Sequence, residues 1–421
     1  MTKTNIDRMP TEPVHRVVVV GAGYAGVLAA NRLLSSLANS AGEGGGVPCS
    51  VTVVNPRPDF IERIRLHEVA AGTRATAATP LRQVLHPDAA LVVGKVALID
   101  PDEHLVEVVV DRTVADRRVQ SIHYDTLVYA VGSTADHSVP GVDEHAYRVA
   151  DVDSAGALQS AIAALADKAR VRIVGGGLTA VETAGEIAAA NPRLDVEIVC
   201  GGTILGFMRE SARRRVTATL SKLGVTWRED TQVTEVTKDA ITTTGGERLE
   251  FDVCVWTASF AVPDLAFTSG LATDAAGRLR VDETLTSIDH PDIIGAGDAV
   301  VLPSDAYPYL RMGCAMALPL GGHAAATILA RLRGQQPEPL SVGFVAQCIS
   351  IGRKYGYIQF VRADDSPRPL ALSGRMGARF KEAICSMTLN SLIKEQTRPG
   401  AYKAPKGPKA AAPTGDDRVR R

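Results

Sequence analysis

The stretch of sequence that decides the fold is Arg16-Val-Val-Val-Val20, followed directly by Gly21-Ala-Gly23-Tyr-Ala-Gly26. A short apolar run before glycines at the spacing G-x-G-x-x-G predicts a buried strand, a tight turn and the start of a helix. The first glycine allows the sharp bend, the second lets the backbone approach a pyrophosphate, and the third lets the helix pack on the strand. Free amides at the helix start favour an anion there. We therefore expect this turn, with Tyr24 and Ala25, to bind a dinucleotide; a turn without a ligand is the simpler alternative.

A second turn of the same kind follows the apolar strand Val171-Arg-Ile-Val174 and reads Gly175-Gly-Gly177-Leu-Thr-Ala180. Alanine is the tolerated replacement for the third glycine. One such turn is a weak signal, but two, each placed after a strand, indicate a protein that holds two dinucleotides face to face. Gly175, Gly177, Leu178 and Thr179 are the candidate contacts, and a turn without a ligand is again the alternative.

Length and composition are those of an ordinary globular protein. The chain has 421 residues, of which 45% are hydrophobic and 22% charged, enough for two or three domains. Its net charge of -1 gives no reason to expect a nucleic-acid partner. No window of the sequence reaches the roughly 20 apolar residues of a membrane span. The apolar stretch from Val17 to Ala30 contains the fingerprint glycines and no clear cleavage site follows, so we expect a cytoplasmic protein.

The six cysteines are not paired in the sequence. None forms the close spacing of a zinc knuckle or of a CxxC redox couple. We therefore expect free thiols, no metal site, and no relay of electrons through a vicinal disulfide.

Several segments in a fixed order carry a family resemblance. After the first glycine turn come YDTLVYAVGS at 124–133, GGGLTAVETAGE at 175–186, FDVCVWTAS at 251–259 and IIGAGD at 293–298. Together they resemble the flavoproteins with two dinucleotide-binding domains, the pyridine nucleotide-disulfide oxidoreductase superfamily. The likeness is to the branch related to type II NADH dehydrogenase and apoptosis-inducing factor, over roughly residues 16–362. It implies FAD in the first glycine turn and a nicotinamide dinucleotide in the second.

The resemblance also implies a fold and its division along the chain. We expect an α/β protein with two Rossmann-like three-layer domains and a small α+β C-terminal domain. The expected parts are a disordered tail at 1–13, the FAD-binding domain at 14–138 and 262–335, the NAD(P)-binding domain at 139–261, the C-terminal domain at 336–395, and a disordered basic tail at 396–421. That tail would keep the protein in solution or make a weak contact with an anionic membrane surface.

The FAD site implied by the resemblance includes Asp298, which would accept a hydrogen bond from a ribityl hydroxyl of the flavin. The alternative for Asp298 is a turn residue or helix N-cap. The helix entered near 314–319 would direct its first amides at the flavin pyrimidine. The segment 60–72 resembles the part of the family that lies along the flavin, so Arg63, Arg65 and His67 are candidates, unless the segment is simply a solvated amphipathic stretch. The other candidate contacts are Arg57, Ala130, Gly132, Ala258, Gly297 and Ala315.

Two acids lie on the helix after the second turn. In the relatives the first carboxylate of this helix points to the place where nicotinamide meets flavin. Glu182 could position the nicotinamide or transfer a proton, and it is the one catalytic candidate. Glu186 would more simply complement the helix dipole, a role that is also the alternative for Glu182.

The residue that usually binds the adenosine ribose is not acidic at either site. Asn55 occupies this place in the first unit and can still bond a ribose hydroxyl, whereas Cys200 occupies it in the second. A carboxylate there would hold the 2′-hydroxyl of NADH and repel the 2′-phosphate of NADPH. Arg209 and the run 213–215 could meet that phosphate, or could form a solvated helix face. NADH, NADPH and a vestigial second site therefore all stay open.

The acceptor side also departs from the respiratory relatives. The relatives carry a glutamine beside the quinone where alignment on Gly321 places Ala315, and they end in strongly apolar helices that seat them on the membrane. Segment 373–394 is more polar, and a stripe of larger apolar residues could face the core or a second copy in a homodimer. These residues are Phe380, Ile384, Met387, Leu389, Leu392 and Ile393.

We expect a soluble FAD-dependent oxidoreductase that takes hydride from NADH or NADPH and reduces a quinone or another small acceptor. The first rival is a flavin oxidase or dehydrogenase that acts directly on a metabolite, which the cysteine at position 200 favours. The second is a redox-responsive partner-binding protein, for which the basic tail is the local support.

Overall fold

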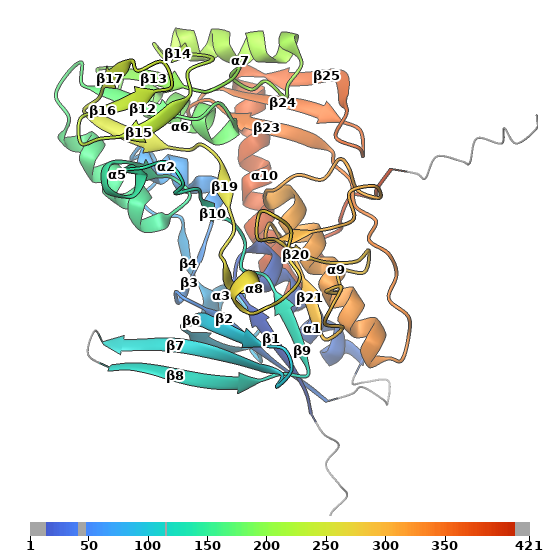
Figure 1. The fold of residues 1–421 in the computed structure, drawn as a ribbon. Coiled ribbons are helices and arrows are strands. Elements are labelled where there is room, and N and C mark those ends of the chain that lie inside the picture. Colours follow the sequence, from blue (N-terminus) through green and yellow to red (C-terminus); the bar gives the residue numbers. More distant parts are fainter. Residues whose placement is uncertain (1–13, 41–47, 114–115, 409–421) are drawn as a thin grey trace, which may run out of the picture.

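The structure is a computed structural model that describes residues 14–40, 48–113 and 116–408 (Figure 1). The tail expected at 1–13 therefore lies outside the described residues.

A parallel five-stranded sheet forms the centre of the first domain. Val17 to Val20 are almost fully buried, as expected for a strand covered on both faces. The long helices α1 (Tyr24–Ser40) and α9 (Cys314–Leu332) pack against each other beside it. In order across the sheet, the strands are β21 (Ile293–Gly295), β9 (Thr126–Tyr129), β1 (His15–Val20), β2 (Cys49–Asn55) and β5 (Ala90–Val93).

Smaller elements complete this domain. An antiparallel sheet projects from its base in Figure 1 and consists of β6 (Lys95–Asp100), β7 (Leu105–Thr113) and β8 (Asp116–His123). The segment after β2 contains β3 (Asp59–Ile61), a 3₁₀ turn at Arg63–Arg65, α2 (Leu66–Ala70), β4 (Ala78–Pro80) and α3 (Leu81–Val84). Later in the chain come α8 (Leu265–Thr268), β20 (Leu279–Arg280) and β22 (Val300–Val301).

The second domain repeats the parallel sheet, which confirms the predicted pair of Rossmann-like domains. Its strands in spatial order are β14 (Thr226–Arg228), β13 (Asp195–Val199), β12 (Arg170–Val174), β18 (Val253–Trp256) and β11 (Tyr147–Arg148). Its helices are α4 (Val142–His145), α5 (Val152–Ala164), α6 (Leu178–Ala190) and α7 (Glu210–Lys222). A small antiparallel sheet adds β15 (Val233–Val236), β16 (Ala240–Thr243) and β17 (Arg248–Glu250).

The chain crosses between the two domains through a pair of short antiparallel strands. β10 (Thr134–Ala135) leads into the second domain and β19 (Phe260–Ala261) leads back. The predicted boundaries at 138 and 261 fall beside this pair. Both crossings therefore lie between the two parallel sheets, as Figure 1 shows.

The C-terminal part contains three antiparallel strands followed by a long helix, as predicted. These are β23 (Ala346–Ser350), β24 (Gly356–Val361), β25 (Pro367–Ser373) and α10 (Gly374–Glu395). The apolar stripe expected on α10 is divided, since Leu392 is buried whereas Phe380, Met387 and Ile393 are exposed.

The chain does not leave the body of the protein at residue 396, and the predicted boundary of the tail is wrong in this respect. Glu395 is fully buried and accepts the backbone amides of Gly400 and Tyr402 at 3.0 and 2.8 Å. Arg32 on α1 pairs with Glu395 and donates to the Tyr402 carbonyl at 2.6 Å. This buried carboxylate fastens the segment after α10 to the first domain, while 409–421 lies outside the described residues.

One helix of the described residues, α9, has the length and apolar composition of a membrane span. In the structure, 67% of its most apolar window is buried inside the protein. Its packing against α1 accounts for this apolar composition.

The close packing of α1 and α9 depends on Gly321. A Cβ atom at this position would overlap the backbone carbonyl of Ala25. We expect G321A to lower the free energy of unfolding by roughly 1–3 kcal/mol, the usual cost of overpacking. Gly156 on α5 is the matched control, because an added Cβ there meets nothing within 4 Å. Urea unfolding should show G156A at least as stable as the parent, and equal losses in both variants would contradict this packing.

Candidate functional site

The first glycine turn has the shape of a dinucleotide cradle. Gly21 has a φ of +101°, and a Cβ atom there would overlap the carbonyl of Ala130. A Cβ atom on Gly26 would overlap the carbonyl of Gly21, so the helix can lie this close to the turn only without one. Gly23, in contrast, has nothing within 4 Å of the same position. Open space before the first turn of α1 is what an approaching pyrophosphate requires.

Asn55 stabilises this cradle from the end of β2. Its Oδ1 accepts the backbone amide of Ala22 at 2.9 Å, and its Nδ2 donates to the Arg57 carbonyl at 2.8 Å. A carboxamide still has one donor and one acceptor position left after these two bonds. The predicted contact to a ribose hydroxyl therefore remains a proposal. The two observed hydrogen bonds hold the glycine turn against the end of β2.

Asp298 joins three segments at the head of α9. It accepts the Ser133 hydroxyl at 2.8 Å through Oδ2 and the backbone amide of Gly313 at 2.7 Å through Oδ1. Gly297 before it has a φ of +88°. Asp298 is not the N-cap of α9, because that place belongs to Gly313. The carboxylate thus lies beside the first amides of α9 and the end of β9, where the resemblance places the flavin.

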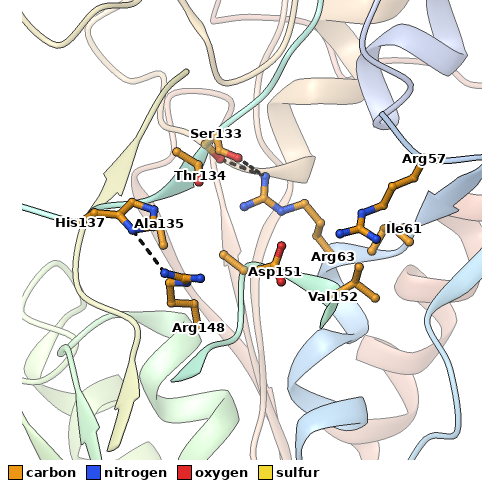
Figure 2. Close-up of a pocket in the computed structure, with 11 residues that line it drawn as sticks. Arg57, Ile61, Arg63, Ser133, Thr134, Ala135, His137, Arg148, Asp151 and Val152 are labelled. Atoms are coloured by element: carbon orange, nitrogen blue, oxygen red, sulfur yellow. Dashed lines mark hydrogen bonds between the residues drawn. The ribbon is translucent and has the colours of Figure 1, made fainter. Parts of the chain in front are cut away.

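A pocket of about 330 Å³ lies between the two domains (Figure 2). The Arg63 guanidinium is turned toward Ser133 and donates to its carbonyl at 2.7 Å. Arg57 and Arg148 also line the pocket but pair with Asp153 and Asp143. Arg63 has no carboxylate partner within the described part of the chain. Its positive charge is therefore available to pair with an anionic ligand in this pocket.

Arg65, by contrast, points away from this pocket, and its prediction as a cofactor contact is corrected. Its side chain is only 4% exposed and donates to Glu382 at 2.6 and 2.7 Å and to Glu68 at 3.0 Å. His67 is likewise buried, and burial lowers its pKa. The segment 60–72 is thus neither solvated nor uniformly aimed at the cofactor.

The second glycine turn repeats the geometry of the first. Gly175 has a φ of +132°, and a Cβ atom there would lie 2.5 Å from the Thr257 hydroxyl. The same atom on Gly177 would meet nothing within 4 Å. Leu178 and Thr179 begin α6, and Ala180 is buried where the helix packs. Ala258 adjoins this turn, its backbone nitrogen 3.1 Å from the position of a Gly175 Cβ atom.

Glu182 on α6 forms a mostly buried ion pair with Lys381 on α10, at 3.0 Å, with side chains 13% and 15% exposed. It also accepts the backbone amide of Ser350 at 3.0 Å, and Lys381 donates to the Cys348 carbonyl at 3.3 Å. Burial opposes both charges, but the pair outweighs it: Lys381 and the Ser350 amide hold the pKa of Glu182 below its ordinary value, and Glu182 holds the pKa of Lys381 above its own. Both groups are therefore charged at neutral pH. Lys381 could not be found from the sequence, because it lies far along the chain on a helix that reads as polar.

Glu186 has a different environment from the one predicted. It is fully buried, accepts the Thr73 hydroxyl and lies 3.9 Å from the Arg353 guanidinium. Arg353 pairs in addition with Glu68 at 2.6 Å and Glu382 at 2.9 Å. Glu186 thus belongs to a cluster of charges between the domains and does not serve the helix dipole.

Two of the arginines considered for NADPH are held by other groups. Arg209 donates to the Pro367 carbonyl at 2.9 Å, and Arg214 pairs with Glu210 at 2.9 Å. Cys200 is buried, with its thiol 3.0 Å from the Gly202 carbonyl. These contacts remove the structural basis for a 2′-phosphate site made by Arg209 and Arg214.

Cysteines and metal ligands play no visible part in the site. All six thiols are free, and burial raises the pKa of Cys348 and of Cys385 to about 11. No group of three or more potential metal ligands occurs in the described residues.

Ala315 lies in the first turn of α9, one residue after Cys314.

Two parallel sheets with a glycine cradle at the end of each central strand define the class of this protein: a flavoprotein oxidoreductase fold with two dinucleotide-binding domains. The chain belongs to the pyridine nucleotide-disulphide oxidoreductase family, which it matches over residues 15–315. This membership confirms both the resemblance seen in the sequence and the predicted fold class.

Relatives by sequence point to one branch of this family. An NADH dehydrogenase-like protein of Mycobacterium tuberculosis is 31% identical over 80% of this chain and 86% of its own length. The type II NADH:quinone oxidoreductase of Staphylococcus epidermidis is 26% identical over 90% of this chain and 96% of its own length.

Solved structures show the same fold at lower identity. The sulfide:quinone oxidoreductase of Aquifex aeolicus has a TM-score of 0.77 at 18% identity, over 91% of this chain and 92% of its own. NDH2 of Plasmodium falciparum in complex with NADH has a TM-score of 0.74 at 15% identity, over 91% of this chain and 98% of its own.

The ion pair predicts a pH-dependent change in stability. K381M should lower the free energy of unfolding by about 3 kcal/mol at neutral pH, because it leaves a buried carboxylate without a partner. In the parent, the pKa of folded Glu182 is depressed, so its contribution is present above the ordinary glutamate pKa and is lost as the pH falls through the folded value. In K381M the unpaired carboxyl has its pKa raised by burial, so the deficit should shrink as the pH falls.

Urea unfolding between pH 3 and 8 measures both trends. The double variant E182Q/K381M removes both charges and should recover part of the stability at neutral pH. Equal stability of K381M and the parent at neutral pH would contradict the buried pair.

Proposed function

We propose that this chain is an FAD-dependent oxidoreductase that takes electrons from NADH and passes them to a quinone. One observation carries the proposal: each domain has a glycine turn at the carboxyl end of its parallel sheet, with open space before Gly23 in the first turn and before Gly177 in the second. The family and the names of the relatives, an NADH:quinone oxidoreductase among them, support it. When bound, FAD supplies the redox chemistry, and the protein supplies binding, alignment and charge.

In this proposal the first cradle holds FAD. The amides of α1 receive its pyrophosphate, Arg63 supplies a positive charge in the pocket, and Asp298 accepts a hydroxyl of the ribityl chain. The second cradle, with Gly175 and Gly177, holds the pyrophosphate of NADH. The chain aligns the two cofactors, and such alignment can lower a reaction barrier by about 7–11 kcal/mol.

We assign the Glu182–Lys381 pair a role in the reduction of the electron acceptor. Reduction of a quinone by NADH consumes one proton from solvent, and the quinone gains two electrons and two protons. An ammonium group has three donors, of which Glu182 and the Cys348 carbonyl use two. The third can meet the negative charge that develops on the acceptor oxygen. A pocket of about 420 Å³, which Lys381 lines together with Ser350 and Arg379, gives a small molecule access to this ammonium.

Contact with a second copy or with a membrane surface is a finer proposal. Its support is the set of apolar side chains that α10 exposes: Met376, Phe380, Met387 and Ile393. The basic tail, in contrast, supports a partner-binding role less than expected, since its first residues pack on the body of the protein.

The proposal is tested by anaerobic stopped-flow mixing of the FAD-loaded protein with NADH. Bleaching of the flavin absorbance is expected, and its absence would refute the proposal. Bleaching by a metabolite alone, without a nicotinamide, would instead support the direct flavin oxidase.

The role of Glu182 is tested by separating the two half-reactions. E182Q should slow reoxidation of the reduced protein by a quinone by about 100-fold, the usual contribution of a group that handles protons. Reduction by NADH should change much less. Gln keeps the acceptor for the Ser350 amide, but it removes the charge that pairs with Lys381, so circular dichroism must first show that E182Q is folded. An equal loss in both half-reactions, or in neither, would contradict the assignment.

A further inference from the structure

The second cradle has an unexplained feature on the side where the adenosine ribose would lie. In doubly wound sheets a dinucleotide lies across the carboxyl ends of the strands, and an acid after the second strand binds the ribose 2′-hydroxyl. Here the second strand is β13, and the residue that follows it is Cys200, a buried thiol. The sheet order places β14 directly beside β13, on the side away from the glycine turn of β12.

Two carboxylates, those of Glu229 and Asp230, follow β14 at the carboxyl end of the sheet, beside Cys200. Val199 pairs with Arg228 in the β13–β14 register, so the next residues, Cys200 and Glu229, lie side by side. The Glu229 carboxylate accepts the backbone amide of Ile204 at 2.8 Å, which holds it against the loop that follows β13. Only one of its oxygens is used in this bond, and the residue is exposed.

The turn after Glu229 is fastened to the same loop. Asp230 has a φ of +52°, and its amide donates to the Gly202 carbonyl at 3.2 Å. Thr231 donates in turn to the Cys200 carbonyl at 2.8 Å. The charges of Glu229 and Asp230 add to burial in raising the pKa of Cys200, which reflects how near both carboxylates lie. Two negative charges therefore stand at the place where sequence alone showed none.

Three arginines of this domain are held by other groups. Arg228 is engaged by Glu197 at 3.2 Å and Glu247 at 2.9 Å. Arg209 and Arg214 make the contacts described above, with Pro367 and Glu210. A 2′-phosphate at this edge would meet like charge, whereas a hydroxyl would find an acceptor.

We propose that Glu229, assisted by Asp230, replaces the missing acid of β13 from the adjacent strand and makes the enzyme selective for NADH over NADPH. Glu229 accepts the 2′-hydroxyl of the adenosine ribose, and both carboxylates repel a 2′-phosphate. This inference rests on the proposed function, because it assigns a role within the same nucleotide site. It also supplies an acid in place of the missing residue whose absence favoured a vestigial site.

The double variant E229Q/D230N tests the assignment. We expect its ratio of kcat/KM for NADPH to that for NADH to rise roughly tenfold, since removal of each carboxylate relieves a like-charge repulsion. Gln at 229 still accepts the Ile204 amide, and both residues are exposed, so the fold should be kept. D195N is the matched control: Asp195 is an exposed acid at the opposite, amino end of β13 and should leave the ratio unchanged.

Calorimetry with nucleotide fragments gives a readout that does not depend on turnover. The parent should bind adenosine 5′-monophosphate in preference to adenosine 2′,5′-bisphosphate, and the double variant should lose that preference. If NADH fails to bleach the flavin of the parent, the proposed function itself fails. If NADH does bleach it but E229Q/D230N behaves as D195N in both measurements, this inference is overturned and the proposed function stands.

Discussion

The close approach of one backbone to another at a few glycines is the constraint on which this structure depends. Gly21 lies against the Ala130 carbonyl, Gly26 against the carbonyl of Gly21, and Gly321 against that of Ala25. These contacts press α1 onto the central strands and α9 onto α1. As a result the first amides of both helices and the Asp298 carboxylate converge at the ends of β1 and β9. A side chain at any of the three would separate elements that must stay together for a cofactor site to exist.

Ion pairs between buried and partly exposed groups hold three parts of the chain in position relative to one another. Lys381 and Glu382 on α10 pair with Glu182 on α6 and with Arg65 after β3. Arg353 joins the same network. Ion pairs of this kind contribute little net stability, because desolvation offsets their attraction, but a misplaced partner is costly. They therefore specify how the C-terminal part docks on the two nucleotide domains, and they leave Lys381 facing a pocket.

The fold and the two cradles could be predicted from the sequence because their determinants are local. A strand, a glycine turn and a helix start within a dozen residues, and the duplication repeats the pattern. The partners of the site residues could not be predicted in this way, because Lys381 and Arg353 come from a distant part of the chain. The same limitation led to the misassignment of Arg65 and Glu186, whose burial depends on those partners. Glu229 was missed because it follows the strand next to the one that usually carries the acid.

The central claim is that open space before Gly23 and Gly177 receives two dinucleotides. Neither glycine has a positive φ, and a Cβ atom on either meets nothing within 4 Å, so valine should be accommodated in the protein without its ligands. The most direct test is the FAD content per chain of G23V and G177V, measured on protein shown to be folded by circular dichroism. The account predicts that G23V is folded but colourless and that G177V keeps its FAD and no longer responds to NADH. A G23V protein with full FAD content would contradict it.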